Sequence, residues 1–279
     1  MNKRPNSRVN LDKAIERLFG TGAKFIEARS LLANAVVGQF LPDGVAKGGS
    51  ALKLRFGPLG FRATRDLDAA RRGSIEEFVR LLEERLQAGW NGFTGAVAPG
   101  RPARPHGVPG EYVMRPFEVR LAYNGRPWCT VDLEVGHDEI GDADDPEYVL
   151  SPAVAAMFEA LGFPAPAPVP LMPISFQIAQ KLHGATEPSS RRAHDLVDLQ
   201  LILAQGEPDW ARTRAVCIRL FDYRRRQPWP PTVVPGADWP ALYATQAQGL
   251  PVLPTVEEAT AWTSRLIARI DSARPSPSS

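Results

Sequence analysis

The spacing of apolar residues predicts amphipathic helices in both halves of the chain. The pattern is clearest between residues 74 and 88, where Phe78, Leu82 and Leu86 share one side of a helix and Glu83 lies on another. The opening Ser-Ile-Glu-Glu is a capping box, which satisfies free backbone N–H groups at a helix start. By the same criteria, further helices are expected over residues 10–20, 24–40, 51–56, 151–161, 174–184, 191–199, 209–226, 239–248 and 256–273.

Alternating apolar and polar residues predict a β-hairpin between residues 112 and 136. Asn124-Gly125 is a sequence that type I′ hairpin turns prefer, because both turn residues adopt a positive φ. Since side chains alternate between the faces of a strand, the return strand has one face that packs on helices and one that is polar. The apolar face comprises Cys129, Val131, Leu133 and Val135, and the polar face comprises Thr130, Asp132 and Glu134.

Glycine and proline interrupt these patterns in two places. Residues 89–110 are rich in both, and either a long mobile loop near the site or a solvated disordered segment is expected there. Residues 164–173 contain closely spaced prolines, so that no helix persists and a connector between lobes is predicted. Short strands over residues 45–47 and 61–69 complete an expected α+β fold, with a small mixed sheet in the N-terminal half and helices in the C-terminal half.

Composition narrows the class of protein. The chain has 279 residues, of which 44% are hydrophobic and 23% charged, and its net charge of +2 does not by itself indicate nucleic-acid binding. No apolar run approaches transmembrane length, and no apolar segment follows the basic N-terminus, so we expect a cytoplasmic protein with no membrane partner. Cys129 and Cys217 are too few for a disulfide framework.

Candidate chemistry is concentrated between residues 47 and 68. Gly48-Gly49-Ser50 precedes a short apolar helix, and free backbone N–H groups at a helix N-terminus are a natural seat for phosphate. Asp66 and Asp68 lie two residues apart on a predicted strand, so both carboxylates should project from one face. Because neighbouring carboxylates repel each other, a divalent cation is the usual partner of such a pair. The combination suggests a metal-bound triphosphate.

Gly-Ser, a helix and then Asp-x-Asp on a strand resemble the nucleotidyltransferase signature of the DNA polymerase β-like superfamily. The leading Lys-Gly-Gly, the long gap from Ser50 to Asp66, and Arg-x-Thr-x-Asp-Leu-Asp make the chain similar to AbiEii/AbiGii-type nucleotidyltransferase toxins of bacterial toxin–antitoxin and abortive-infection systems. The resemblance implies a polymerase β-like mixed sheet with flanking helices in a catalytic lobe at residues 1–150. A helical C-terminal lobe at 151–274 and a disordered tail at 275–279 are expected to follow.

The resemblance also implies the ligands of the N-terminal site. Asp66, Asp68 and a third carboxylate would hold two Mg²⁺ ions, with Mn²⁺ as an alternative. Asp132 is the expected third ligand, provided that its strand neighbours the strand of Asp66 and Asp68; Glu134 is the alternative, and either could instead be a solvated strand residue. The nucleoside triphosphate is expected to contact Gly48, Gly49, Ser50 and Arg62.

A second motif lies in the C-terminal half. Lys181 is the only lysine there, which alone is compatible with an ordinary surface residue. AbiEii-type toxins carry a lysine on the helix after the catalytic sheet and Arg-x-Lys-Asp-x-x-Asp-Leu on the next helix. The residues that match here are Arg192, Asp195, Asp198 and Leu199. His194 stands where a lysine is common, which leaves the basic role of that position open.

This second match implies that Lys181 and Arg192 contact the triphosphate and that Asp195 orients one of them as part of the catalytic site. From spacing alone, Asp195 and Asp198 are equally compatible with a solvated helix face near a helix N-terminus. Asp198 is expected to be structural.

The resemblance implies transfer of a nucleoside monophosphate from a nucleoside triphosphate to an acceptor. The expected acceptor is the 3′ end of transfer RNA, so that translation and growth stop, and a cognate antitoxin is the expected partner. Two alternatives stay open: a nucleotidyl- or phosphotransferase that modifies protein or itself, and a non-catalytic effector that binds nucleotide. Arg224-Arg225-Arg226 either complements a helix C-terminus or contacts an RNA backbone.

Overall fold

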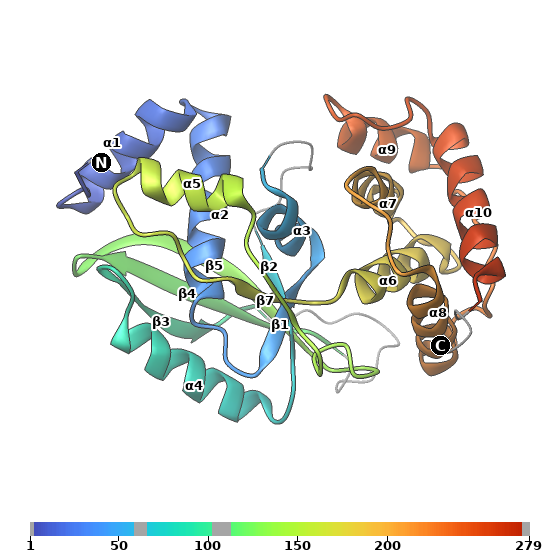
Figure 1. The fold of residues 1–279 in the computed structure, drawn as a ribbon, viewed down its shortest axis with the longest axis horizontal. Coiled ribbons are helices and arrows are strands. Elements are labelled where there is room, and N and C mark those ends of the chain that lie inside the picture. Colours follow the sequence, from blue (N-terminus) through green and yellow to red (C-terminus); the bar gives the residue numbers. More distant parts are fainter. Residues whose placement is uncertain (1–2, 59–65, 102–112, 275–279) are drawn as a thin grey trace, which may run out of the picture. The chain divides into compact units, whose positions relative to one another are not determined.

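The computed structural model describes residues 3–58, 66–101 and 113–274. The chain divides into two compact units, with the boundary of the second at Pro173. The first unit holds a seven-stranded mixed sheet and the second is helical (Figure 1). A boundary at residue 150 was expected, together with a proline-rich connector between the lobes at residues 164–173, and the second unit begins where that connector ends. The first unit also includes α5 (Pro152–Ala160) and β7 (Val169–Leu171).

The sheet of the first unit has the strand order β3-β4-β5-β2-β1-β7-β6. Its parallel pairs are β2 with β5 and β1 with β7, and the other neighbours are antiparallel. The strands are β1 (Gly44–Lys47), β2 (Leu67–Arg71), β3 (Phe93–Pro99), β4 (Arg115–Tyr123), β5 (Arg126–His137), β6 (Glu147–Val149) and β7.

One face of the sheet is apolar and belongs to a continuous core. Val131, Leu133 and Val135 of β5 are buried, whereas Asp132 and Glu134 on the opposite face are exposed, as the alternation predicts. The core also includes buried residues of α2 (Ala23–Gly38) and α4 (Ile75–Ala88). The other helices described in this unit are α1 (Arg8–Phe19), α3 (Gly48–Phe56) and α5. The polar face of the sheet is therefore available for a binding site.

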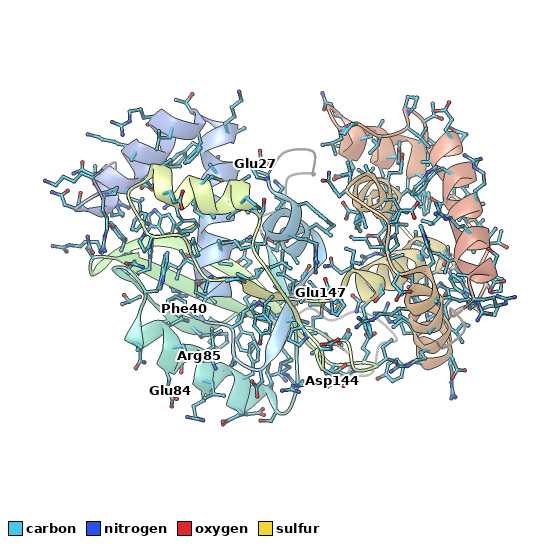
Figure 2. The ribbon with its side chains drawn as sticks, viewed as in Figure 1. Glu27, Phe40, Glu84, Arg85, Asp144 and Glu147 are labelled. Carbon is cyan, nitrogen blue, oxygen red and sulfur yellow. The ribbon has the colours of Figure 1, made fainter. Side chains whose placement is uncertain are left out.

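Local capping fixes where several elements begin. Ser74 accepts a hydrogen bond from the Glu77 backbone N–H at 3.1 Å, which confirms the predicted start of α4. The Asn124-Gly125 turn has φ values of 47° and 72°, as a type I′ hairpin requires. Two ion pairs connect α3 to neighbouring elements. Lys53 pairs with Glu27, and Arg55 pairs with Glu147. Glu27 and Glu147 are labelled in Figure 2.

Two segments that were expected to be loop or connector contain strands instead. Residues 93–99 form β3, although residues 89–110 were expected to be loop, because β3 pairs along its whole length with β4. In the proline-rich connector, Val169 and Leu171 form strand β7 around Pro170, and the Met172 backbone N–H donates to the Ala46 carbonyl at 2.9 Å. Proline excludes a helix but is compatible with an extended strand. Residues 102–110 of the expected loop lie outside the described residues.

In its described residues, the second unit contains five helices. They are α6 (Ile174–Thr186), α7 (His194–Ala204), α8 (Trp210–Arg224), α9 (Trp239–Ala247) and α10 (Val256–Ser272). Helix α6 packs against α7 and α8, and α10 contacts α7, α8 and α9. Within the described residues, none of the chain's helices combines the length and apolar character that crossing a bilayer demands.

Candidate functional site

The Gly-Gly-Ser turn lies inside the first turn of α3. The helix begins at Gly48, three residues earlier than expected, and Gly48 has a φ of +70°. The first backbone N–H groups of a helix lack partners within the helix, so they can bind an anion. The Ser50 hydroxyl is buried, accepts a hydrogen bond from Asn34 at 3.0 Å and donates to the Asp66 carbonyl. In this arrangement Ser50 fixes the backbone at Asp66.

Strand register places three charged residues in a row on the polar face of the sheet. Lys47 of β1 pairs with Asp68 of β2, and Asp68 pairs with Glu134 of β5. Residues paired across neighbouring strands project to the same face. Asp66 directly precedes β2 and is exposed. The expected strand began earlier, at residue 61, but residues 61–65 lie outside the described residues, as does the predicted contact Arg62.

The register brings Glu134, rather than Asp132, next to Asp68. Burial raises the pKa of the Glu134 carboxyl, and the nearby charges of Asp68 and Asp66 raise it further, while Lys47 lowers it. Asp132 lies on the same face two residues earlier along β5 and pairs with Glu118 of β4. Both carboxylates that were considered for the third ligand therefore lie on the face of Asp68, and Glu134 is its direct neighbour.

The carboxylates suit a divalent cation by their chemistry. Mg²⁺ and Mn²⁺ prefer carboxylate oxygens, and the mutual repulsion of Asp66, Asp68 and Glu134 is the condition that a cation relieves. In the described part of the chain, no three acidic, histidine or cysteine side chains are already arranged closely enough to hold a metal ion. The donor set fits such an ion by its chemistry.

Lys47 is the residue of this site that the sequence analysis missed. Its ammonium group lies 3.4 Å from the point that a Cβ on Gly136 would occupy, so the side chain extends toward β5. It lowers the pKa of the nearby Glu134 carboxyl. The only signal in the sequence was its position immediately before Gly48-Gly49. A cation beside two carboxylates and a helix N-terminus can balance the charge of a phosphate group.

Gly48 is required by close packing as well as by backbone conformation. A Cβ at this position would lie 2.0 Å from the Asp68 carboxylate oxygen Oδ2, so the two groups cannot coexist without movement. We expect Gly48→Ala to lower the nucleotide transfer that the resemblance implies by about 100-fold, since displacing a reacting group by ~1 Å has an effect of this order. The measurement is the initial rate of nucleotide transfer, with thermal unfolding in parallel.

Gly73 provides the matched control for Gly48. Its φ is +67°, but nothing lies within 4 Å of a Cβ added there. Gly73→Ala and Gly48→Ala should therefore lose a similar amount of stability, about 1–2 kcal/mol, from the left-handed backbone alone. Equal transfer rates in the two variants would contradict the assigned contact with Asp68.

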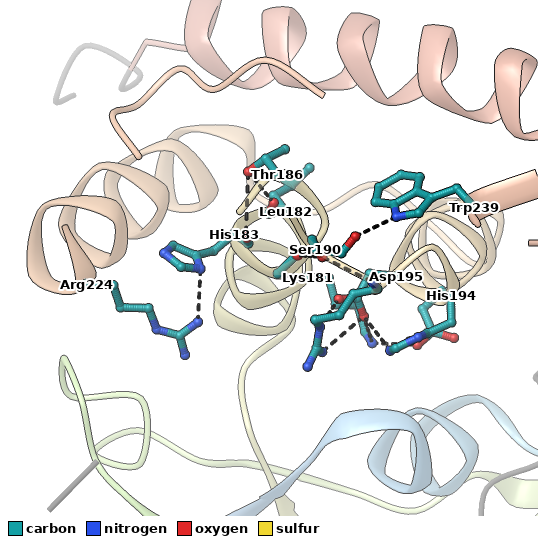
Figure 3. A network of polar contacts seen from close by, with 12 residues as sticks. Lys181, Leu182, His183, Thr186, Ser190, His194, Asp195, Arg224 and Trp239 are labelled. Carbon is teal, nitrogen blue, oxygen red and sulfur yellow. Dashed lines mark hydrogen bonds and ion pairs between the residues drawn. The ribbon is translucent and has the colours of Figure 1, made fainter. Parts of the chain in front are cut away.

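The second predicted motif forms a buried ion cluster within the helical unit (Figure 3). The Lys181 Nζ atom of α6 lies 2.6 Å from Asp198 Oδ2 and 3.4 Å from Asp195 Oδ1, both on α7. The side chain of Lys181 is 7% exposed and those of the two aspartates are at most 1% exposed. These two carboxylates are thus not a solvated helix face.

Two further side chains, Arg192 and His194, complete the cluster around Asp195. The Arg192 Nε atom lies 2.6 Å from Asp195 Oδ2, and His194 Nε2 lies 3.6 Å from Asp195 Oδ1 (Figure 3). Burial would raise the pKa of Asp195, but Lys181 and Arg192 more than offset this and hold it at about 2. The Arg192 side chain is 53% exposed, so it could also reach a phosphate in solution.

The family model described as nucleotidyl transferase AbiEii toxin, type IV toxin–antitoxin system, matches residues 30–266. No curated protein sequence matches the chain. The structure is similar to that of MenT4, a nucleotidyltransferase toxin of Mycobacterium tuberculosis, with a TM-score of 0.51 and 18% identity over 95% of this chain and 98% of that chain. It also matches JHP933 of Helicobacter pylori, with a TM-score of 0.45 and 19% identity over 86% and 89% of the two chains.

At this identity, the likeness to MenT4 establishes a shared fold and confirms the expected α+β nucleotidyltransferase architecture. The family match confirms the resemblance drawn from the Gly-Gly-Ser turn and the Asp-x-Asp pair. Because the family model spans most of the sequence, the chain belongs to the AbiEii family of nucleotidyltransferase toxins of type IV toxin–antitoxin systems.

Proposed function

We propose that the protein transfers a nucleoside monophosphate from a nucleoside triphosphate to the 3′ end of a transfer RNA in the bacterial cytoplasm. The observation that carries the proposal is the row of Lys47, Asp68 and Glu134 beside the N-terminus of α3. In the reaction, the acceptor hydroxyl oxygen bonds to the α-phosphorus while the bond to the leaving pyrophosphate breaks. Transfer to this end of the RNA would block aminoacylation and thus growth, and an antitoxin would counteract it.

The residues of the first unit would have three separate roles: metal binding, phosphate binding and charge neutralisation. Asp66, Asp68 and Glu134, or Asp132 in place of Glu134, would hold Mg²⁺ or Mn²⁺, which stabilises the charge on the attacking and leaving oxygens. The backbone N–H groups of the first turn of α3, at Gly48, Gly49 and Ser50, would bind phosphate oxygens. Lys47 would neutralise part of the remaining charge. These steps rely on positioning and electrostatics, as phosphoryl transfer generally does.

The predicted triphosphate contacts Lys181 and Arg192, and the predicted catalytic residue Asp195, belong to the second unit. Lys181 is held by two buried carboxylates, whereas Arg192 is half-exposed. Arg192 is therefore better placed than Lys181 to meet a phosphate directly, and Asp195 would orient it. The predicted contact Arg62 stays part of the proposal.

The test uses the purified full chain with Mg²⁺, total cellular RNA and each α-labelled nucleoside triphosphate in turn. We expect label in RNA of transfer-RNA size, and the nucleotide that labels best is the preferred substrate. Label in protein instead of RNA would favour the protein-modifying alternative. Tight triphosphate binding without label in either would favour the non-catalytic effector.

A pair of isosteric substitutions tests the third carboxylate. We expect Glu134→Gln to lower the transfer rate by about 100-fold or more, because removing one preorganised charge from such a site has an effect of this size. Asp132→Asn should lower it by less than about tenfold, because the register places Asp132 farther from Asp68. Transfer rates over a Mg²⁺ titration are the measurement, and the reverse order of effects would assign the ligand to Asp132.

A further inference from the structure

Helix α8 ends beside a cavity in the second unit that the nucleotide-transfer site does not use. The cavity has a volume of about 470 Å³, within the range of small-molecule binding pockets. Its apolar wall comprises Ile218, Phe221 and Trp229, and its charged rim comprises Asp222, Arg225 and Arg226. Aromatic rings and arginines around one hollow are the elements that single-stranded nucleic acid requires.

The aromatic wall is held in a fixed position. The rings of Phe221 and Trp229 pack edge to face with centroids 5.3 Å apart, and Phe221 is buried. The Trp229 indole N–H donates to Asp271 Oδ1 at 2.9 Å, so its polar group is already satisfied. The indole is half-buried and lines the cavity. A preorganised aromatic surface of this kind binds a base by stacking, with little loss of conformational entropy.

The segment of chain that borders the cavity is basic. Arg219, Arg224, Arg225 and Arg226 lie within eight residues that contain one acidic side chain, Asp222. In the described part of the chain Arg225 has no carboxylate partner; its Nε donates to the Asp222 carbonyl oxygen at 3.3 Å. Arg226 pairs with Glu187 at 2.7 Å, and 62% of its side chain is exposed. These guanidinium groups leave a net positive charge around the cavity.

The positive charge of the nearby arginines also acts on the neighbouring His183, whose pKa burial and this charge both lower. Its Nδ1 atom lies 3.4 Å from Arg224 Nη1, as Figure 3 shows. Burial lowers the pKa of His183 to about 3, together with the charges of Arg224, Arg192 and Arg226. The imidazole is therefore neutral at physiological pH and does not contribute to the positive charge, which comes from the arginines.

Arg225 also has an unusual backbone conformation. It follows α8 with φ and ψ of 52° and 30°, the left-handed position that glycine usually occupies at a helix C-terminus. A helix C-terminus favours cations, which explains a basic residue in the last turn. That effect explains neither an arginine in a strained conformation nor the aromatic cavity beside it. Strained residues of this kind concentrate at ligand-binding sites.

We propose that this cavity binds an unpaired base of the acceptor RNA, which stacks on Trp229 while Arg225 and Arg226 contact the flanking phosphates. The inference rests on the proposed function, because it concerns how the same enzyme holds its acceptor. A single strand is favoured over a duplex, since only an unpaired base exposes a face for stacking. The cavity would thus select RNA with a single-stranded end.

The test measures binding of a labelled single-stranded RNA oligonucleotide to the full chain by fluorescence anisotropy, without triphosphate. We expect Trp229→Ala to weaken binding roughly 5- to 100-fold, the effect of losing one base–aromatic stack, and Trp229→Phe to restore most of it. Arg225→Gly should weaken binding and lower the slope of log K against log salt by about 0.7. The same variant should raise the thermal unfolding midpoint, because glycine relieves the left-handed strain.

Arg265→Ala on α10 is the control for the arginines, since Arg265 is exposed and does not line the cavity. RNA affinity that is unchanged in both Trp229→Ala and Arg225→Gly, or absent from the native protein, would overturn the proposal. Label transfer to total RNA, measured in parallel, keeps the two proposals separate. Undiminished transfer to RNA in both variants would reject this cavity and leave the proposed function intact. If the native protein labels only protein, but both variants lose RNA binding, the proposed transfer to RNA would be rejected and the RNA-binding cavity would be supported.

Discussion

Replacement of Asp68 by alanine is expected to abolish nucleotide transfer, with a loss of at least about a thousandfold. Asp68 is the centre of the row on the polar face of the sheet, between Lys47 and Glu134. A loss of about 4 kcal/mol of charge stabilisation in the transition state corresponds to that factor, and a bound metal ion supplies several kcal/mol. Growth inhibition in cells that express the variant should be lost together with transfer to RNA.

The fold should survive this substitution. Asp68 is only half-buried, and its negative charge raises the pKa of the Glu134 carboxyl. Removal of a repulsive neighbour should leave the thermal unfolding midpoint unchanged or slightly higher. Asp68→Asn, which keeps the shape of the side chain, should be nearly as inactive. Asp43→Ala is the matched control, because Asp43 is an exposed carboxylate of the same unit. An Asp68→Ala protein that remains equally toxic would contradict the metal-site assignment.

Replacement of Lys181 by methionine is expected to lower the free energy of unfolding by about 3–5 kcal/mol, the effect of breaking a buried ion pair. Lys181 is the partner of both Asp195 and Asp198 across the contact between α6 and α7. Methionine fills a similar volume but leaves carboxylates buried with less compensating charge. Urea-induced unfolding of the full chain, followed by circular dichroism, measures the loss.

Lys53 provides the control for this effect. It is as buried as Lys181, but the side chain of its partner Glu27 is 40% exposed. After Lys53→Met the Glu27 carboxylate can be hydrated, so the loss of stability should be smaller. The double variant Lys181→Met, Asp198→Asn should recover part of the loss, since it also removes one buried charge. Unchanged stability in Lys181→Met would contradict the structural role.

This result also decides how activity data on Lys181 are interpreted. A triphosphate contact would raise KM at temperatures where the variant is folded. Loss of the buried pair would instead lower the fraction of folded protein. Transfer assays on Lys181→Met therefore need a folded fraction measured under the same conditions.

Much of the local structure follows from the sequence, because its causes are local. The capping box at Ser74 and the Asn124-Gly125 turn each contain all the residues that define them. Strands β3 and β7 were not predicted, because pairing with distant segments outweighs their glycines and prolines. Local composition alone does not reveal such pairing.

The sequence indicated most of the residues of the candidate site, but not how they are arranged relative to one another. The choice between Asp132 and Glu134 depends on the register of β5 against β2, which no short motif encodes. The register of β1 against β2 brings Lys47 into the site. The i, i+3 spacing of Asp195 and Asp198 was visible in the sequence, but their burial against Lys181 depends on the packing of α6 on α7.

The parallel pairing of β2 with β5 also has a consequence for the newborn protein. Lys47 and Asp68 are synthesised well before Glu134, which joins their row only when β5 pairs with β2. A chain that is still being translated through the hairpin therefore lacks one side of its acidic cluster. The acidic cluster can therefore be complete only once about half of the chain, through β5, has been synthesised.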